Sequence, residues 1–108
     1  MIKVVIVQNY ARWAERGDII MKIVKNASAG TMESSDVYVE IEPAKELTVG
    51  LESVVKAQFG DAILEVVHEV LNEHRVDKAA VRIVDRGALE CVIRARVETA
   101  ILRGKGEA

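Results

Sequence analysis

The sequence predicts an α+β protein of two layers, in which an antiparallel four-stranded sheet packs against one long helix. Apolar and polar residues alternate over 37–42, 47–52 and 79–84, a period of two that is typical of half-buried strands. Between the second and third of these segments, apolar residues recur three and four positions apart from Phe59 to His74, which predicts an amphipathic helix. With a fourth strand and a short terminal helix, the expected order is β-β-α-β-β-α.

The connections complete this expectation. A short segment at Pro43 separates the first two strands, so we expect them to form an antiparallel hairpin. Residues 85–87 predict the turn of a second hairpin. Residues 89–97 fit an alternating strand and, more loosely, a helix; their β-branched content and the preceding turn favour the strand, which would bury Cys91. Residues 98–103 then predict a short helix.

Composition narrows the function classes. The chain has 108 residues, of which 50% are apolar and 30% charged, as expected for one globular domain. A net charge of −2 gives no general attraction to nucleic acid. The sequence has no secretory signal and no apolar run of membrane-spanning length, so we expect a cytoplasmic protein without a membrane partner. One cysteine and two histidines predict no internal disulfide and no metal site.

Residues 1–20 fit the rest of the chain poorly. An apolar run at 2–7 is followed by a segment with neither helical nor strand periodicity. Met21 is itself a plausible start, and Glu15-Arg16-Gly17 can be encoded by a purine-rich run resembling a ribosome-binding site. We therefore predict that residues 1–20 are an extension outside the natural fold and that the domain comprises 21–108. The alternative is a genuine extra strand at a sheet edge.

The stretch with most functional promise is 29–36, which is small and polar and directly precedes the first predicted strand. It contains Ser34 and Ser35, flanked by Glu33 and Asp36. Loops that precede rigid strands often present exposed functional side chains. By composition alone, an ordinary solvated loop remains the alternative.

The chemistry of this stretch favours a carrier or binding module over an enzyme. Catalysis by Ser34 or Ser35 would need a base and an orienting group, and the two histidines lie in the predicted helix. The sequence contains no Gly-x-Ser-x-Gly elbow, phosphate loop or dinucleotide fingerprint. An exposed serine hydroxyl on a loop can instead serve as an attachment point for a phosphodiester.

Three blocks at 30–36, 55–63 and 85–96 together resemble the acyl carrier (gamma) subunit of citrate lyase, from about residue 21 to about residue 104. The first reads Gly-Thr-Met-Glu-Ser-Ser-Asp, the second Val-Lys-Ala-Gln-Phe-Gly-Asp-Ala-Ile, and the third Asp-Arg-Gly-Ala-Leu-Glu-Cys-Val-Ile-Arg-Ala-Arg. In the family pattern, the modified serine follows the Glu of the first block. That serine is Ser34 here, and Ser35 stands where some relatives have Gly.

The resemblance implies a covalent 2′-(5″-phosphoribosyl)-3′-dephospho-coenzyme A arm on Ser34, attached by a separate prosthetic-group transferase. It also implies two partners: an alpha (transferase) subunit, which exchanges the acetyl group on the thiol of the arm for citrate, and a beta (lyase) subunit, which cleaves the citryl thioester to oxaloacetate and acetyl thioester. The carrier itself would make no bond.

Four charged residues are candidates for recognition of the arm or of partner proteins. Glu33 and Asp36 are candidates for recognition by the transferase, with turn capping or solvation as the alternative for Asp36. Arg94 and Arg96 are candidates for pairing with arm phosphates or a partner subunit, with a solvated strand face as the alternative. The carrier subunits of malonate decarboxylase and citramalate lyase, and a structural subunit without a cofactor, remain rival functions.

Overall fold

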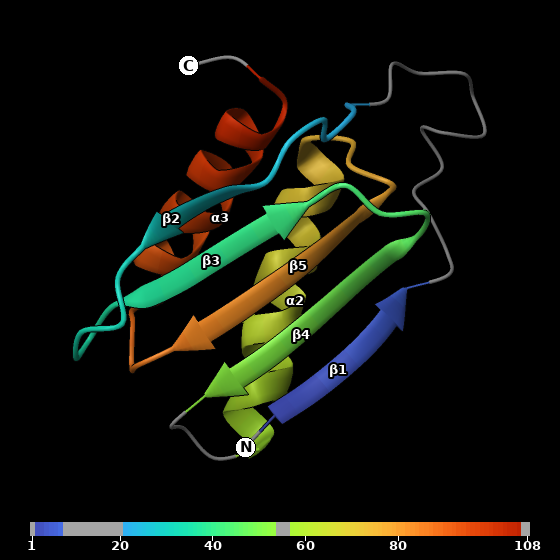
Figure 1. Ribbon diagram of the computed structural model, residues 1–108. Helices are drawn as coiled ribbons and strands as arrows, with labels where there is room; N and C mark the ends of the chain where they lie inside the picture. Colours follow the sequence, from blue (N-terminus) through green and yellow to red (C-terminus); the bar gives the residue numbers. More distant parts are fainter. Residues whose placement is uncertain (1, 8–20, 54–56, 107–108) are drawn as a thin grey trace.

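A computed structural model of the chain describes residues 2–7, 21–53 and 57–106. Its strands form one sheet in the order β1-β4-β5-β3-β2 (Figure 1). Within these ranges, two helices are packed against the sheet. In chain order the elements are β1 (Ile2–Val7), β2 (Ala27–Gly30), β3 (Val37–Glu42), β4 (Leu47–Ser53), α2 (Ala57–Glu73), β5 (Ala79–Asp85) and α3 (Glu90–Gly104).

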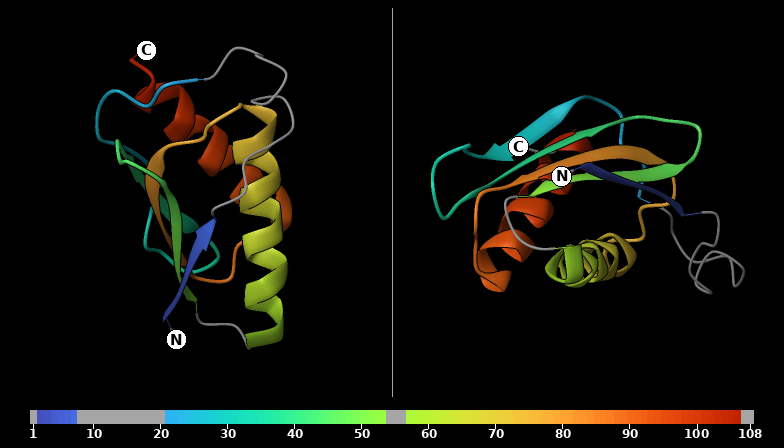
Figure 2. Two further views of the ribbon diagram at one scale, coloured as in Figure 1. Left: turned by 90° about the vertical axis from the view of Figure 1, so that its right-hand side faces the viewer. Right: turned by 90° about the horizontal axis from the view of Figure 1, so that it is seen from below.

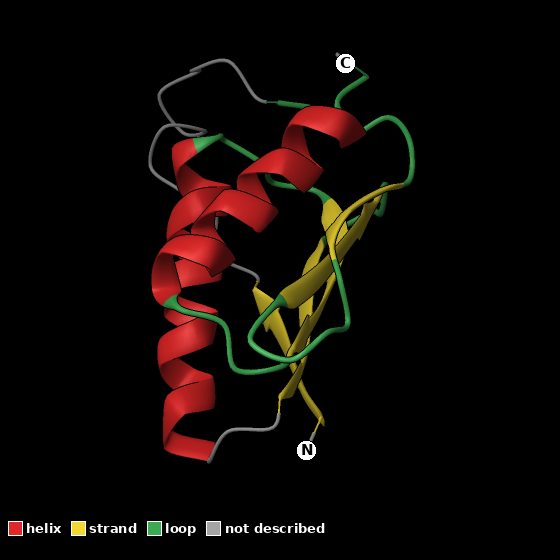
Figure 3. Ribbon diagram, turned by 90° about the vertical axis from the view of Figure 1, so that its left-hand side faces the viewer, coloured by secondary structure: helices red, strands yellow, loops and turns green. Residues whose placement is uncertain are grey.

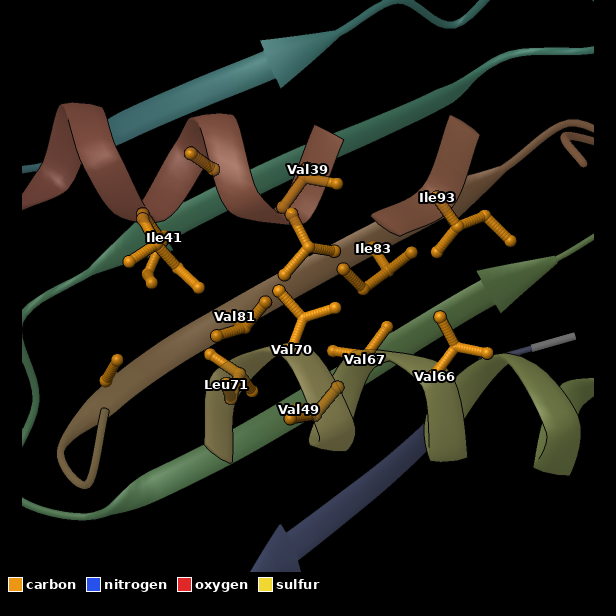
Figure 4. Close-up of a cluster of buried hydrophobic side chains, with 14 of the residues drawn as sticks. Val39, Ile41, Val49, Val66, Val67, Val70, Leu71, Val81, Ile83 and Ile93 are labelled. Carbon is orange, nitrogen blue, oxygen red and sulfur yellow. The ribbon is translucent and has the colours of Figure 1, made fainter. Parts of the chain in front are cut away.

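Both helices cover the same face of the sheet, which confirms the predicted two-layer α+β class (Figures 2 and 3). Helix α3 packs on β2 and β3, whereas α2 packs on β4 and against α3. Apolar side chains from the strands and helices meet between the layers (Figure 4). The side chain of Phe59 lies outside the described part of the chain. The rest of the predicted stripe of α2 contributes five buried residues: Ile63, Val66, Val67, Val70 and Leu71.

The pairing of the strands differs from the prediction. β3 and β4 do not form a hairpin, because β5 lies between them, antiparallel to β3 and parallel to β4. The sheet is therefore mixed, and strands β2–β5 with the helices follow the order βββαβα. The four residues 43–46 suffice for this connection, since two strand spacings are about 10 Å and four residues reach about 13 Å. A short connection thus did not determine which strands pair.

The predicted fourth strand at 89–97 is wrong, and so is the second hairpin. Residues 85–87 lead from β5 into α3, which runs without interruption through the predicted terminal helix. Cys91 is exposed rather than in the core. The helical spacing prevails because α3 buries residues three, four and seven apart against β2, β3 and α2: Ile93, Val97, Ala100, Ile101 and Gly104.

Strand β2 and the start of helix α2 also differ from the prediction. Strand β2 was missed because its four residues are Ala-Ser-Ala-Gly, which have low strand propensity. Helix α2 begins at Ala57, two residues before the predicted stripe starts at Phe59. Neither helix in the described ranges has the length and apolar character needed to cross a lipid bilayer.

The N-terminal segment is described only in part. Strand β1 pairs antiparallel with β4 at the edge of the sheet, from Ile2 opposite Glu52 to Val7 opposite Leu47. Residues 8–20 lie outside the described residues. The assignment of 1–20 as an extension outside the domain therefore stays a prediction.

A left-handed residue ends helix α2 and yields the first testable expectation. Arg75 has φ +58°, and the amide of Val76 donates to the carbonyl of Leu71 at 3.0 Å, as in a Schellman motif. Glycine adopts this conformation without strain, so Arg75→Gly should stabilise the fold by about 0.5–1 kcal/mol. Thermal denaturation should show a higher Tm for Arg75→Gly, and Arg75→Ala, which keeps the strain, should not reproduce the rise.

Candidate functional site

The serine stretch forms the loop of a hairpin between β2 and β3 (Figure 1). Ser34 lies at its outer turn, where the amide of Asp36 donates to the carbonyl of Glu33 at 3.1 Å, and its side chain is exposed. Ser35 follows with φ +66°, a conformation that glycine adopts most easily. The two serines thus differ, since Ser34 occupies the apex and Ser35 the strained position of the turn.

Asp36 holds the base of this loop together. Its carboxylate accepts hydrogen bonds from Thr31 Oγ1 at 2.7 Å and from the amide of Val37 at 2.7 Å. Arg96 on α3 donates to the same carboxylate through Nε at 3.2 Å and Nη2 at 3.3 Å. The base of the loop is therefore tied to the helix layer by a bidentate pair.

These contacts shift the titration of Asp36. The hydrogen bond from Thr31, then that from Val37, and then Arg96 lower the pKa of the carboxyl from 3.8 to about 2. Because the folded pKa is the lower one, the stabilisation is complete above about pH 4 and is lost as pH falls toward 2. Thermal melts from pH 5 to pH 2 should show the Tm gap between the wild type and Asp36→Asn closing. A gap that stayed constant would contradict this.

The connection between β5 and α3 lies against the serine loop. The amide of Ser35 donates to the carbonyl of Arg86 at 2.8 Å, and the amide of Arg86 donates to the carbonyl of Asp36 at 2.9 Å. Gly30 at the start of the loop has φ +89°, and a Cβ there would lie 1.8 Å from the carbonyl oxygen of Val37. The loop, this connection and α3 are thus in direct contact.

A buried carboxylate fixes the connection. Asp85 is 1% exposed and accepts hydrogen bonds from Ser53 Oγ at 2.9 Å and from the amides of Gly87 and Ala88 at 3.2 and 3.0 Å. A buried carboxylate with three donors stabilises the backbone locally, and its removal leaves those donors unsatisfied. Asp85 therefore links the end of β4 to the segment that enters α3.

Removing this carboxylate should be costly. We expect Asp85→Ala to lower the free energy of unfolding by about 2–3 kcal/mol, and Ser53→Ala by about 1 kcal/mol, because the latter removes one of the three hydrogen bonds. Urea denaturation of both variants measures the difference. Equal, small effects would show that the carboxylate contributes no more than an exposed one.

The four predicted recognition residues lie in different places. Glu33 is exposed in the loop beside Ser34. Asp36 and Arg96 pair at the base of the loop. Arg94 instead contacts Glu69 and Glu73 on α2, together with Glu90 on its own helix, so it links the two helices. The expectation that Arg94 and Arg96 share a strand face is wrong, because both are on α3.

Sequence reasoning missed the contributions of Gly30, Thr31 and Arg86. Thr31 and Gly30 belong to the first family block but were given no role of their own, whereas in the structure the glycine permits close packing. Arg86 acts through its backbone, which leaves no signal in residue type. These contacts depend on which elements adjoin the loop, and that follows from the topology.

The site presents a nucleophilic oxygen without an attached catalytic apparatus. His74 lies beyond the end of α2 and contacts Glu98 at 3.2 Å. The Nε2 of His68 is buried without a hydrogen-bond partner among the described residues, and burial lowers the pKa of this imidazole. No group of metal-ligating side chains occurs in the described ranges. What the arrangement offers is the exposed hydroxyl of Ser34 at the apex of an anchored turn, with Ser35 also exposed beside it.

Known proteins resemble this chain in sequence and in fold. A family model described as an ACP, malonate decarboxylase delta subunit, matches residues 24–104. A solved structure described as a Pseudomonas malonate decarboxylase hetero-tetramer in complex with malonate superposes with a TM-score of 0.68 over 95% of both chains, at 16% identity. At that identity the likeness shows the fold alone.

Sequence relatives are more specific. Citrate lyase acyl carrier protein 2 of Salmonella paratyphi A and the citrate lyase acyl carrier protein of Escherichia fergusonii are each 54% identical over 85 residues, covering 77% of this chain and 88% of theirs. The citrate lyase acyl carrier protein of Haemophilus ducreyi is 47% identical over 88 residues, covering 82% and 93%. The chain therefore belongs to the citrate lyase acyl carrier protein family.

Proposed function

We propose that this chain is the acyl carrier subunit of a cytoplasmic citrate lyase complex and that Ser34 bears its prosthetic arm. The arm is 2′-(5″-phosphoribosyl)-3′-dephospho-coenzyme A, joined to Ser34 Oγ by a phosphodiester. The observation that carries the proposal is the exposed position of Ser34 at the apex of an anchored turn, in a chain of this family.

Attachment of the arm is a phosphoryl-type transfer. The oxygen of Ser34 forms a new O–P bond, and a phosphoanhydride bond of an activated arm nucleotide breaks. The serine proton goes to a base on the prosthetic-group transferase, and the leaving phosphate group takes the electron pair. In this role the carrier supplies only the oxygen, and the base belongs to the transferase.

The arm would carry acetyl and citryl thioesters on its terminal thiol between the alpha (transferase) and beta (lyase) subunits. Tethering raises the effective concentration of the thioester at both active sites and prevents its loss to solvent. The anchored base of the serine loop suits this arrangement, because a fixed origin confines the reach of the arm while the arm itself supplies the mobility.

A malonate decarboxylase carrier is the alternative with independent support, through the description of the matching family model and the similarity in fold. The identity of 54% to citrate lyase carriers favours the citrate lyase assignment. A citramalate lyase carrier is a further rival, and the acyl group accepted by the assembled complex distinguishes these possibilities.

Intact mass spectrometry tests the proposal. Protein purified from its natural host should exceed the polypeptide mass by one arm, and protein produced without the prosthetic-group transferase should have the bare mass. If host-derived protein had the bare mass, the chain would be a structural subunit without a cofactor.

A further inference from the structure

We propose that Met32 and Leu89 form a docking surface for the enzyme that attaches the arm. The inference rests on the proposed function, because it assigns a partner to the surface around Ser34. We call this surface, together with Ser34, the tip. It combines the loop between β2 and β3 with the segment that enters α3.

Exposed apolar side chains gather at the tip and at the opposite end of α3. Among the described side chains, the large apolar residues left exposed are Val24 at 60%, Met32 at 44%, Leu89 at 71% and Leu102 at 38%. Leu89 and Leu102 are 13 residues apart on or beside α3, about 20 Å along a helix, and the amide of Val24 donates to Gly104 at the far end. Met32 and Leu89 therefore belong to one end of the molecule and the other two to its opposite end.

Backbone hydrogen bonds hold the two halves of the tip together. The segment that carries Leu89 begins at Arg86, whose carbonyl and amide are bonded to Ser35 and Asp36. Met32 lies two residues before Ser34 in the same loop. Met32 and the exposed hydroxyl thus share one loop, and the segment that carries Leu89 is hydrogen-bonded to that loop, so docking needs little further ordering of the backbone.

Leu89 also occupies a position that folding alone would fill differently. It is the N-cap of α3, with extended backbone angles and no side-chain hydrogen bond to the helix. Serine, threonine, aspartate or asparagine would stabilise the helix there, whereas leucine does not. Departures from such local folding rules are expected at functional sites, and this one lies in the segment that is hydrogen-bonded to the serine loop.

The geometry of the reaction identifies the occupant as the modifying enzyme. To form the O–P bond, that enzyme must bring its bound nucleotide to within about 3–3.5 Å of Ser34 Oγ, so its surface must cover the residues that flank the hydroxyl. The thiol on which the alpha and beta subunits would act lies instead at the far end of the long arm. Apolar side chains beside the hydroxyl therefore fit the modifying enzyme best.

Single substitutions at Leu89 separate recognition from folding. With the prosthetic-group transferase and its activated nucleotide, arm transfer to Leu89→Ser should be at least roughly tenfold slower in kcat/KM, since a buried leucine contact is lost. The same substitution should raise the Tm by roughly 4 °C, because serine caps α3. Leu89→Met should retain the wild-type rate. Leu102→Ala removes an exposed leucine from the opposite end and should also leave the rate unchanged.

Different results would contradict the docking surface and the proposed function. Unchanged transfer to both Leu89→Ser and Met32→Ala would overturn the docking surface while leaving Ser34 as the attachment site. Equal slowing of Leu102→Ala and Leu89→Ser would also overturn it. A wild-type dimer in sedimentation that Leu89→Ser dissociates would assign the surface to self-association instead. If the wild-type chain received no arm at Ser34, the proposed function itself would fail.

Discussion

Replacing Ser34 with alanine should abolish citrate cleavage by the assembled complex, whereas Ser35→Gly should leave it intact. Alanine has no oxygen to esterify, so no thioester can be delivered to either partner. Ser35 has φ +66°, and glycine accepts this conformation without strain, so the turn that presents Ser34 should be preserved. The readout is oxaloacetate formation by complexes reconstituted with each carrier variant after incubation with the transferase.

Thermal melts provide the control for this pair. Ser34→Ala should keep the wild-type Tm because the side chain is exposed, and Ser35→Gly should match or exceed it. Activity in Ser34→Ala would contradict the assignment of the acceptor. Activity lost in a folded Ser35→Gly variant and kept in Ser34→Ala would move the acceptor to Ser35.

The largest expected loss of stability is at Gly30. A Cβ at this position would lie 1.8 Å from the carbonyl oxygen of Val37 and 3.3 Å from the Cδ of Arg96. The backbone cannot move away from this Cβ without breaking its own hydrogen bonds, so β2 would have to move away from β3 or α3. We expect Gly30→Ala to lower the free energy of unfolding by about 3 kcal/mol and the Tm by at least about 12 °C.

Gly87 is the matched control for this substitution. It has φ +93°, close to that of Gly30, yet a Cβ there would meet nothing within 4 Å. Gly87→Ala should therefore show the cost of the positive φ alone, about 1 kcal/mol. Equal effects of the two substitutions in urea denaturation would mean that the close approach of β2 to β3 is less tight than the structure has it.

Local periodicity was sufficient to predict the elements with one clear period. The strands over 37–42, 47–52 and 79–84 and the stripe of α2 are present because their apolar residues repeat at two or at 3.6. Residues 89–97 satisfied both periods, and the packing of Ile93 and Val97 under the sheet made the helix the more favourable choice. Such a choice depends on tertiary contacts that the local sequence does not contain.

For the candidate site too, some features could be predicted from the local sequence and others depend on tertiary contacts. An exposed loop with Ser34 at its apex was predictable from composition and from the resemblance to the family. The pairing of Asp36 with Arg96 was not, because it joins residues 60 positions apart and depends on α3 being a helix. Mistaking α3 for a strand placed Arg94 beside Arg96, whereas the helical turn directs Arg94 to Glu69 and Glu73 on α2.

Mapping of the modified residue tests the central claim most directly. Protein isolated from citrate-fermenting cells of the natural host should be digested and analysed by tandem mass spectrometry under conditions that preserve phosphodiesters. We expect a single adduct, with the mass of the phosphoribosyl-dephospho-coenzyme A arm, on the oxygen of Ser34. An adduct located on Ser35 or on the exposed Cys91, or a tip peptide that carries no adduct in active complex, would contradict the account.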